Sequence, residues 1–172
     1  GSSHYEFYGW SGTPFQTPGE GTGEIISNPQ AFEVSGVSDL YPVYKQVHYL
    51  TLTSGFTGTS ATYFSPVAVP AGERLMQSDI KSKYIPERPG YTFQGWYLGV
   101  ENAGTDQQNG TGTQVTTEDG TLLTLNTSEI QAVEGTDGYL LLATDVTLYA
   151  KWEAKDVDYT IVVWKQRKTD DS

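Results

Sequence analysis

The sequence predicts an α+β fold that is mostly β, in which one short helix packs on a mixed sheet. Two observations predict it. The 172 residues include 12 Tyr, 6 Phe, 4 Trp and 19 Gly, a composition that suits pleated strands and tight turns better than helices. Stretches of alternating apolar and polar residues surround a single stretch of helical periodicity. The length suits one sizeable domain or two small ones.

Alternating residues predict the strands of the region between residues 46 and 154. In chain order the expected strands are 47–52, 62–69, 91–98, 122–125, 139–143 and 145–153. Turns that contain Gly or Pro separate several of them, because glycine adopts the positive φ values of tight turns and proline ends a strand.

A helix is expected over about 73–84, between the second and the third of these strands. Apolar residues recur there at helical spacing, and Pro86 follows at a point where a helix must end. Residues 100–120 are rich in Gly, Asn, Gln and Thr, which predicts a loop, and 127–130 predicts the start of a helical turn.

Charge is distributed unevenly along the chain. The formal net charge is −11, yet all ten basic residues lie within 45–88 and 151–168. Nucleic acids and anionic membrane surfaces are bound through Lys and Arg, so the long cation-free stretches argue against both as partners. No apolar run is long enough for membrane insertion. Residues 1–4 are interpreted as the remnant of an expression tag.

The sequence has no cysteine and only two histidines. Disulfides, thiolate metal sites and cysteine nucleophiles are therefore excluded, and His48 is the only histidine left for a zinc site or a catalytic triad. The acidic residues form neither a calcium-loop motif nor a recognisable catalytic pair. We therefore expect no enzyme activity, and we assign no cofactor and no metal.

Three short segments recur in the same order along the chain. The matched segments are 5–10 (YEFYGW) with 91–96 (YTFQGW), 39–44 (DLYPVY) with 147–152 (TLYAKW), and 47–52 (VHYLTL) with 157–162 (VDYTIV). Their offsets are 86, 108 and 110 residues. Three aromatic matches in one order indicate an internal repeat, and the change of offset indicates an insertion.

These matches divide the chain out of phase with its repeat. We expect the C-terminal half of a preceding unit over 5–45, a complete unit over 46–154, and the first strand of a following unit within 155–172. The insertion falls at 97–145, and such length variation is typical of loops. Strand 157–165 either completes the 5–45 half-unit or only abuts the complete unit, because an unpaired strand edge tends to find a partner.

Two motifs of the complete unit resemble those of a known family. Residues 86–97 read PERPGYTFQGWY, and residues 146–152 read VTLYAKW. In this order they resemble the Listeria–Bacteroides repeat, the internalin B-type B repeat of bacterial cell-surface proteins. The resemblance implies the small β-grasp-like fold. It covers the complete unit well and the half-unit less well, because Pro42 and Tyr44 replace the family's Ala and Trp.

The resemblance also implies a repeated, non-catalytic module of a large bacterial protein that is secreted or attached to the cell wall. The favoured expectation is a monomeric binding module of an adhesin, which contacts neighbouring repeats and a host protein or glycoprotein such as an immunoglobulin. The inserted loop or a sheet edge would make the host contact, because recognition concentrates in loops that vary on a constant scaffold. The alternative is a structural spacer with no ligand of its own.

Two sets of residues are candidates for these roles. The candidate binding residues are polar and acidic side chains of the insertion: Asp106, Asn109, Glu118, Asp119, Glu134 and Asp137. The second set belongs to the repeated motifs. Of these residues Phe93, Trp96, Tyr149 and Trp152 are expected to fill the core and the interfaces, because aromatic side chains bury large apolar areas; the alternative is a platform on which a ligand stacks. The members of the second set are Tyr91, Phe93, Gly95, Trp96, Leu148, Tyr149 and Trp152, with Phe7, Gly9 and Trp10 from the first copy.

Gly95, Lys151 and the acidic side chains each carry one further expectation. Gly95 should let another backbone approach its strand closely. An intramolecular isopeptide bond through Lys151 and a calcium ion on the acidic side chains both stay open.

Overall fold

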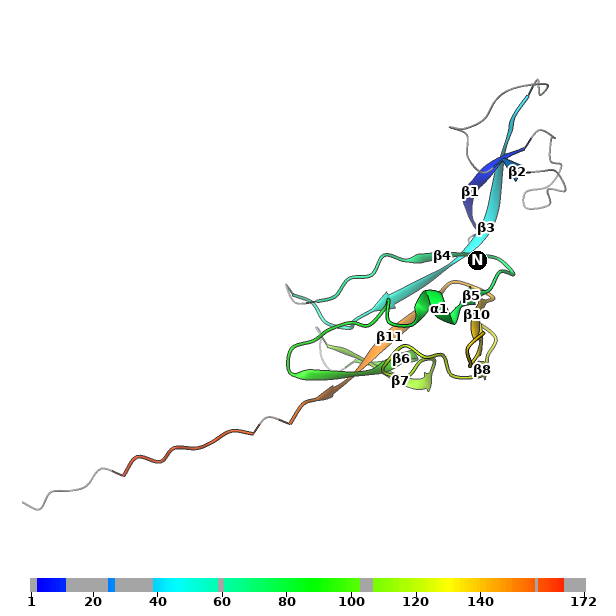
Figure 1. Ribbon diagram of the computed structural model, residues 1–172. Helices are drawn as coiled ribbons and strands as arrows, with labels where there is room; N and C mark the ends of the chain where they lie inside the picture. The colour runs from blue at the N-terminus through cyan, green and yellow to red at the C-terminus, as the bar shows by residue number, and fades with distance from the viewer. Residues whose placement is uncertain are drawn as a thin grey trace, which may run out of the picture.

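Two β-sheets and one short helix make up the computed structural model of the chain (Figure 1), so the predicted mostly-β, α+β class is confirmed. The structure describes residues 3–11, 25–26, 39–58, 61–102, 107–156 and 158–165. The strands are β1 (His4–Ser11), β2 (Ile25–Ile26), β3 (Tyr41–Thr53), β4 (Val67–Pro70), β5 (Leu75–Met76), β6 (Tyr91–Asn102), β7 (Gln108–Gln114), β8 (Leu125–Asn126), β9 (Ile130–Val133), β10 (Tyr139–Leu142) and β11 (Val146–Ala154), and the helix is α1 (Gln77–Ile80).

The larger sheet has the strand order β2-β1-β3-β11-β6-β7, and β4 also pairs with β3. The pairing of β3 with β11 is parallel, with Leu50 opposite Val146 and Thr53 opposite Tyr149. The other pairs described in this sheet are antiparallel. The sheet is therefore mixed, as the sequence predicts.

The smaller sheet has the strand order β5-β10-β9-β8, with every described pair antiparallel. Three of its strands come from the insertion over 97–145, in which strands were expected at 122–125 and 139–143, and the insertion contributes buried side chains to the core. These are Val115, Leu122, Ile130, Ala132, Leu140 and Leu142. Much of the 97–145 segment is therefore an ordered layer of the core.

Strand β3 is shared between the two predicted units. Its 13 residues pair with β1 over 41–47 and with β11 over 50–53. The expected boundary between the half-unit and the complete unit, near residue 46, therefore lies inside one unbroken strand (Figure 1).

The β1–β3 ladder and the β6–β11 ladder have the same register. The matching pairs are Trp10–Pro42 with Trp96–Ala150, and Phe7–Tyr44 with Phe93–Trp152. In both ladders the first strand carries one residue more than its partner between these pairs, so both are interrupted by a bulge at the same step. The matched residues are those that the sequence relates by offsets of 86 and 108.

The expected helix over 73–84 is wrong at both ends. Leu75 and Met76 form β5 and pair with β10, so only 77–80 is helical. Lys81 already has extended backbone angles, and Ser82 has a φ of 65°, which a helix cannot contain. Pairing with the smaller sheet overrides the helical periodicity of the sequence.

Three other expectations also need correction. The expected loop over 100–120 contains β7, and the second strand covers only 67–70 instead of 62–69. The segment 127–130 forms no helical turn, because Thr127 accepts hydrogen bonds from the backbone of residues 129 and 130 and the chain then enters β9. His4 is the first residue of β1.

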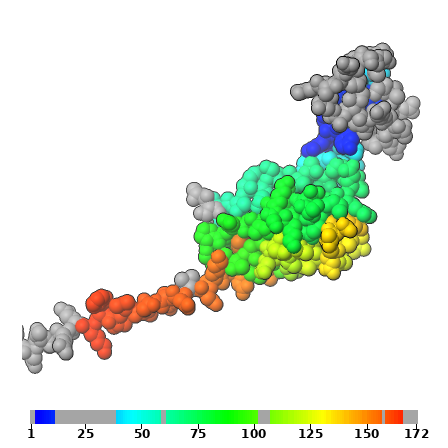
Figure 2. Space-filling model, viewed as in Figure 1, coloured from blue at the N-terminus to red at the C-terminus, as the bar shows by residue number. Residues whose placement is uncertain are grey.

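Residues 158–165 leave the end of β11 as an extended tail (Figures 1 and 2). We call these residues the tail. None of them lies in a strand, and the described residues of β1 and β3 do not pair with them. The half-unit and the tail lie at opposite ends of the complete unit (Figure 2). No helix in the described part of the chain is long and apolar enough to cross a membrane.

Candidate binding surface

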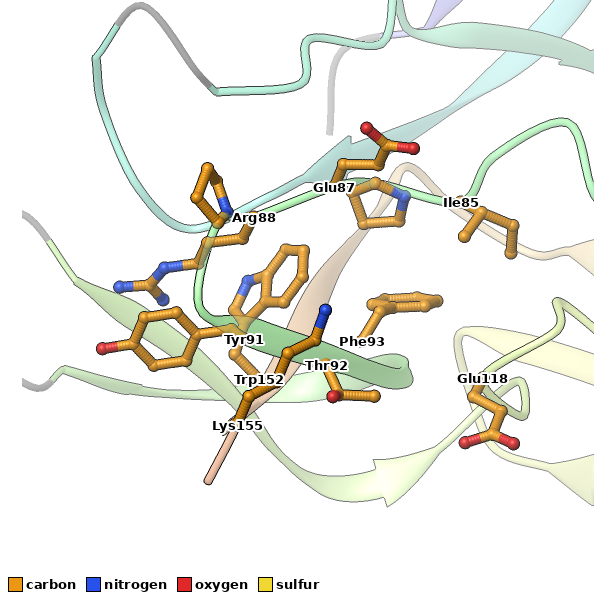
Figure 3. Close-up of a pocket in the computed structure, with 11 residues that line it drawn as sticks. Ile85, Glu87, Arg88, Tyr91, Thr92, Phe93, Glu118, Trp152 and Lys155 are labelled. Atoms are coloured by element: carbon orange, nitrogen blue, oxygen red, sulfur yellow. The ribbon is translucent and has the colours of Figure 1, made fainter. Parts of the chain in front are cut away.

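A groove of about 610 Å³ opens where the segment 85–90 passes the β6–β11 ladder (Figure 3). It lies on the motif that carries the family resemblance. The lining residues are Ile85, Pro86, Glu87, Arg88, Pro89, Tyr91, Thr92, Phe93, Glu118, Trp152 and Lys155.

Arg88 stands at the aromatic side of this groove. Its guanidinium carbon lies 3.8 Å from the ring centroid of Tyr91 and 5.0 Å from that of Phe56, and cations at such distances are attracted to the ring face. Among the described residues no carboxylate lies within ion-pair distance of Arg88. The groove therefore offers an arginine beside aromatic rings, an arrangement that can receive a carboxylate from a partner.

The motif aromatics themselves form a continuous chain of ring contacts inside the core. Phe93 contacts Trp96 and Trp152 with ring centroids 5.3 and 5.7 Å apart. The contacts extend from Trp152 to Phe56, and from Trp96 through Phe64 to Tyr84. The exposed fractions of Trp96 and Trp152 are 1% and 5%. Such buried rings stabilise the unit, and Phe93 and Trp152 also line the inner wall of the groove. Leu148 is buried as well, and Tyr91 and Tyr149 are half-buried.

The two buried indoles also have hydrogen-bond partners. The Nε1 of Trp96 donates to the carbonyl oxygen of Tyr84 at 2.9 Å, and the Nε1 of Trp152 donates to that of Ser54 at 2.7 Å. These bonds attach the irregular segments around Ser54 and Tyr84 to the sheet.

Gly95 has the close backbone neighbour that the sequence predicts. A Cβ at this position would collide with the carbonyl oxygen of Thr116, and its φ of +116° is one that other residues rarely adopt. The neighbouring Trp96 donates its backbone N–H to Thr116 Oγ1 at 3.1 Å. The motif glycine therefore admits the chain that leads from β7 into the second layer.

The predicted binding residues of the insertion do not come together. Asp106 lies outside the described residues. Glu118 and Asp119 lie on a turn between β7 and β8, whereas Glu134 and Asp137 are exposed around the β9–β10 turn. In the described part of the chain no three Asp, Glu or His side chains are placed to hold a metal ion.

Asn109 has a structural partner. Its Oδ1 accepts the backbone N–H of Trp152 at 2.7 Å, and its Nδ2 donates to the Trp152 carbonyl oxygen at 3.4 Å. The side-chain amide thereby supplies hydrogen-bond partners to Trp152 on β11, opposite the bulge in β6.

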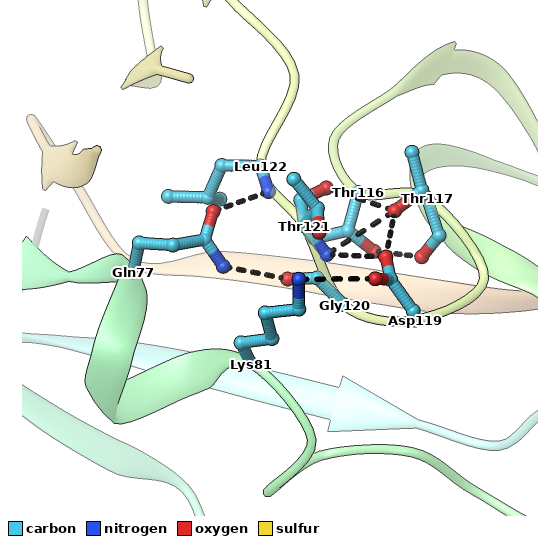
Figure 4. Close-up of polar contacts among 8 residues, drawn as sticks. All are labelled: Gln77, Lys81, Thr116, Thr117, Asp119, Gly120, Thr121 and Leu122. Atoms are coloured by element: carbon cyan, nitrogen blue, oxygen red, sulfur yellow. Dashed lines mark hydrogen bonds and ion pairs between the residues drawn. The ribbon is translucent and has the colours of Figure 1, made fainter. Parts of the chain in front are cut away.

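Asp119 is held within its own turn (Figure 4). Thr117 Oγ1 and the Thr121 backbone N–H donate to its Oδ1, and Lys81 Nζ lies 3.1 Å from its Oδ2. These hydrogen bonds, that of Thr117 first, hold the pKa of the Asp119 carboxyl well below its ordinary value. The hydrogen bonds of the Asp119 carboxylate therefore stabilise its own turn.

Sequence reasoning missed two polar residues that matter. Gln77 is buried, and its side chain donates to the carbonyl oxygen of Gly120 at 3.0 Å and accepts the Leu122 N–H at 2.6 Å (Figure 4). Arg88 was also missed, although an arginine between two prolines of the motif was a visible signal. Lys151, open to an isopeptide bond from the sequence, has its Nζ 5.0 Å from the centroid of the Tyr97 ring.

Compared with protein-family models, with curated proteins and with solved structures, the chain has no match. What the structure defines is a mostly-β fold with a buried aromatic motif and two ladders, β1–β3 and β6–β11, of the same register.

Proposed function

We propose that this chain is a non-catalytic repeat module of a large bacterial surface protein, secreted or attached to the cell wall, and that it acts as a rigid spacer. Two observations support the repeat. The motifs resemble those of the internalin B-type repeat, and the two ladders have one register at the offsets read from the sequence. A β-grasp-like unit is supported by the β3–β4 hairpin, the helix that follows it and the parallel β11 beside β3.

The observation that carries the spacer function is the continuity of β3. Modules joined by flexible linkers reorient freely. Here the closing strand of the half-unit continues without a break as the first strand of the complete unit, so no linker is available to bend. Two successive units in such an array keep a fixed orientation.

Side-chain contacts brace the same junction. Lys45 Nζ lies 2.7 Å from Glu73 Oε1, and Tyr49 donates its hydroxyl to Glu6 at 3.0 Å. Asp145 accepts the Tyr49 backbone N–H at 2.9 Å, and this bond, reinforced by His4 at 2.9 Å, lowers the pKa of its carboxyl. Each contact is exposed and individually weak, yet together they resist rotation about the strand.

Distance measurement between spin labels tests the spacer function directly. The chain has no cysteine, so Tyr5→Cys and Thr136→Cys would label the half-unit and the complete unit at unique exposed positions. The control pair, Thr111→Cys and Thr136→Cys, lies within the complete unit. A spacer gives distance distributions of similar width for both pairs, whereas a much broader distribution across the junction contradicts it.

A second candidate function is the binding of a host protein or glycoprotein. Two observations favour it: the groove with Arg88 unpaired by any described carboxylate, and the position of β7 at the end of the larger sheet. An edge strand can add a strand from a partner. Retention of a partner from host secretions by the wild-type chain, and its loss in Arg88→Ala but not in Lys83→Ala, would favour binding through the groove.

A further inference from the structure

Exposed apolar side chains gather at the two ends of the molecule. Of the eleven large hydrophobic residues that are exposed in the described part of the chain, five belong to the half-unit, five to the tail, and one, Tyr63, to neither. The half-unit residues are Tyr5, Phe7, Tyr8, Leu40 and Tyr44. The tail residues are Tyr159, Ile161, Val162, Val163 and Trp164. Apolar patches of this kind mark interaction surfaces.

The half-unit patch is an uncovered copy of the core of the complete unit. Phe7 contacts Trp10 and Tyr44 with ring centroids 5.6 and 5.9 Å apart, as Phe93 contacts Trp96 and Trp152. The exposed fraction is nevertheless 50% for Phe7, against 7% for Phe93. The rings have the arrangement of a core, but no described segment covers them as the core of the complete unit is covered.

Part of the cover in the complete unit comes from the strand parallel to β11. There Thr51, Leu52 and Thr53 lie beside residues 147–149 of β11. The equivalent residues in the half-unit are 39–41, and the described part of β3 before residue 46 pairs in a ladder with β1 alone. One edge of the half-unit therefore has no described strand partner.

The tail has the sequence of the missing strand. The offset of 110 relates Thr51, Leu52 and Thr53 to Ile161, Val162 and Val163. Transfer of the β3–β11 register then places Ile161 beside Asp39, Val162 beside Leu40 and Val163 beside Tyr41, in parallel orientation; these are the pairs that the equivalence predicts. Val162 would thereby join the face that carries the Phe7 rings.

The tail cannot reach the half-unit of its own chain. Tyr149 of β11 lies beside Thr53 of β3, and the two strands are parallel. Beyond this pair β11 continues for five more residues, whereas Tyr41 lies twelve residues before Thr53 on β3. The end of β11 and Tyr41 therefore lie in opposite directions from the pair. At ~3.3 Å per residue this is a separation of roughly 55 Å. Eight extended residues, from 155 to 162, span at most ~29 Å. The same-chain completion considered from the sequence is therefore sterically unattainable while β3 and β11 are intact.

We propose that the tail of one copy adds as a parallel strand to the half-unit of a second copy, in the register given above. The inference rests on the repeat equivalence used in the proposed function, and it replaces the expected monomer with a self-associating chain. Donor and acceptor lie at opposite ends (Figure 2), so the contact is heterologous and builds open, head-to-tail chains.

Sedimentation velocity over about a hundredfold concentration range tests the association. As concentration rises, the wild-type chain is expected to form species larger than a dimer. A variant without residues 158–172 is expected to stay monomeric. Added in excess, this tail-less variant accepts a tail but donates none, so it shortens the wild-type chains. Val162→Pro removes one ladder N–H and should act like the truncation, whereas Asp158→Asn should not. A wild-type chain that stays monomeric overturns the proposal.

Disulfide trapping tests the register. The chain has no cysteine, so a Leu40→Cys copy mixed with a Val162→Cys copy can form one specific cross-link. We expect this pair to cross-link far more than Leu40→Cys with Trp164→Cys, which lies on the same strand face two residues out of register. Equal yields, or a Leu40→Cys, Val162→Cys double variant that closes within one chain, overturn it. A monomeric chain with a narrow spin-label distribution would refute this inference and leave the spacer function standing.

Discussion

The indole of Trp152 donates a hydrogen bond of 2.7 Å to the carbonyl oxygen of Ser54, 98 residues earlier in the chain. The same indole packs against Phe56 and Phe93. Its counterpart in the half-unit, Tyr44, occupies the same ladder position beside Phe7 but has an exposed fraction of 48%. The same position of the motif is thus buried in the complete unit and exposed in the half-unit.

Because Trp152 is buried and Tyr44 is exposed, truncation to alanine should lower the free energy of unfolding much more at Trp152 than at Tyr44. Trp152→Ala should lower the free energy of unfolding by about 3–5 kcal/mol, because it creates a cavity and leaves a carbonyl oxygen without its donor. Tyr44→Ala should cost less than about 1 kcal/mol in dilute solution, because little is buried there. Urea unfolding followed by circular dichroism measures both, and similar losses would contradict the assignment of Tyr44 to an open site.

Gly95 should tolerate no side chain. Gly95→Ala is expected to lower the free energy of unfolding by more than about 3 kcal/mol, because the Cβ meets the Thr116 carbonyl oxygen and φ is +116°. The control is Gly112→Ala, where φ is +76° and nothing lies within 4 Å of the added atom; only backbone strain of about 1–2 kcal/mol is expected. Equal stabilities for the two variants would show that the close approach is unimportant.

Gln77 should be required for the attachment of α1 to the second layer. Gln77→Met keeps the length of the side chain but leaves the Gly120 carbonyl oxygen and the Leu122 N–H without their partner. Each unsatisfied buried group costs about 1–3 kcal/mol, so a loss of roughly 2–5 kcal/mol is expected in urea unfolding. Gln131→Met, at an exposed position of β9, should be nearly neutral and serves as the control.

The lowered pKa of Asp119 predicts a loss of stability in acid. The unfolded chain binds this proton near pH 3.9 and the folded chain only at lower pH, so the contribution is complete above about pH 5 and declines as the pH falls below about 4. The stability difference between the wild type and Asp119→Asn should therefore shrink on acidification. Urea midpoints between about pH 2 and 6 measure it, with Glu118→Gln as the charge control; a difference that grows in acid has the wrong sign.

The motif strands could be predicted from the sequence because their local pattern agrees with their place in the sheet. Tyr91 does begin β6, and the strand expected over 145–153 is β11, shifted by one residue at each end. The common register of the two ladders was accessible as well, since aromatic residues mark it in both copies.

Strand β10 of the second layer lies where a strand was expected, at 139–143, whereas β7 and the chain that leads from it into that layer could not be predicted, for a physical reason. Strand β7 reads QNGTGTQ and contains no apolar residue, so it forms through backbone pairing with β6 and the close approach that Gly110 permits to Tyr149. Val115 is buried between the polar residues Gln114 and Thr116, without a period that a sequence pattern would reveal. The groove was missed for the same reason, because Arg88 finds its aromatic neighbours through the fold.

Because β3 contributes side chains to both proposed units, the number of residues between the two units decides on which side of the strand each set of side chains lies. Tyr44 and Leu50 are six positions apart on β3, and their counterparts, Trp152 and Thr160, are eight positions apart. Side chains alternate along a strand, so the even spacing places Tyr44 and Leu50 on the same side of β3, and the spacing of eight would do the same in an array in which β11 continued through residue 160. A single inserted or deleted residue at this junction would place the core side chains of one unit on the opposite face of the strand, whereas a change of two residues would leave both sets on their present faces. Junction lengths in such arrays should therefore vary in steps of two.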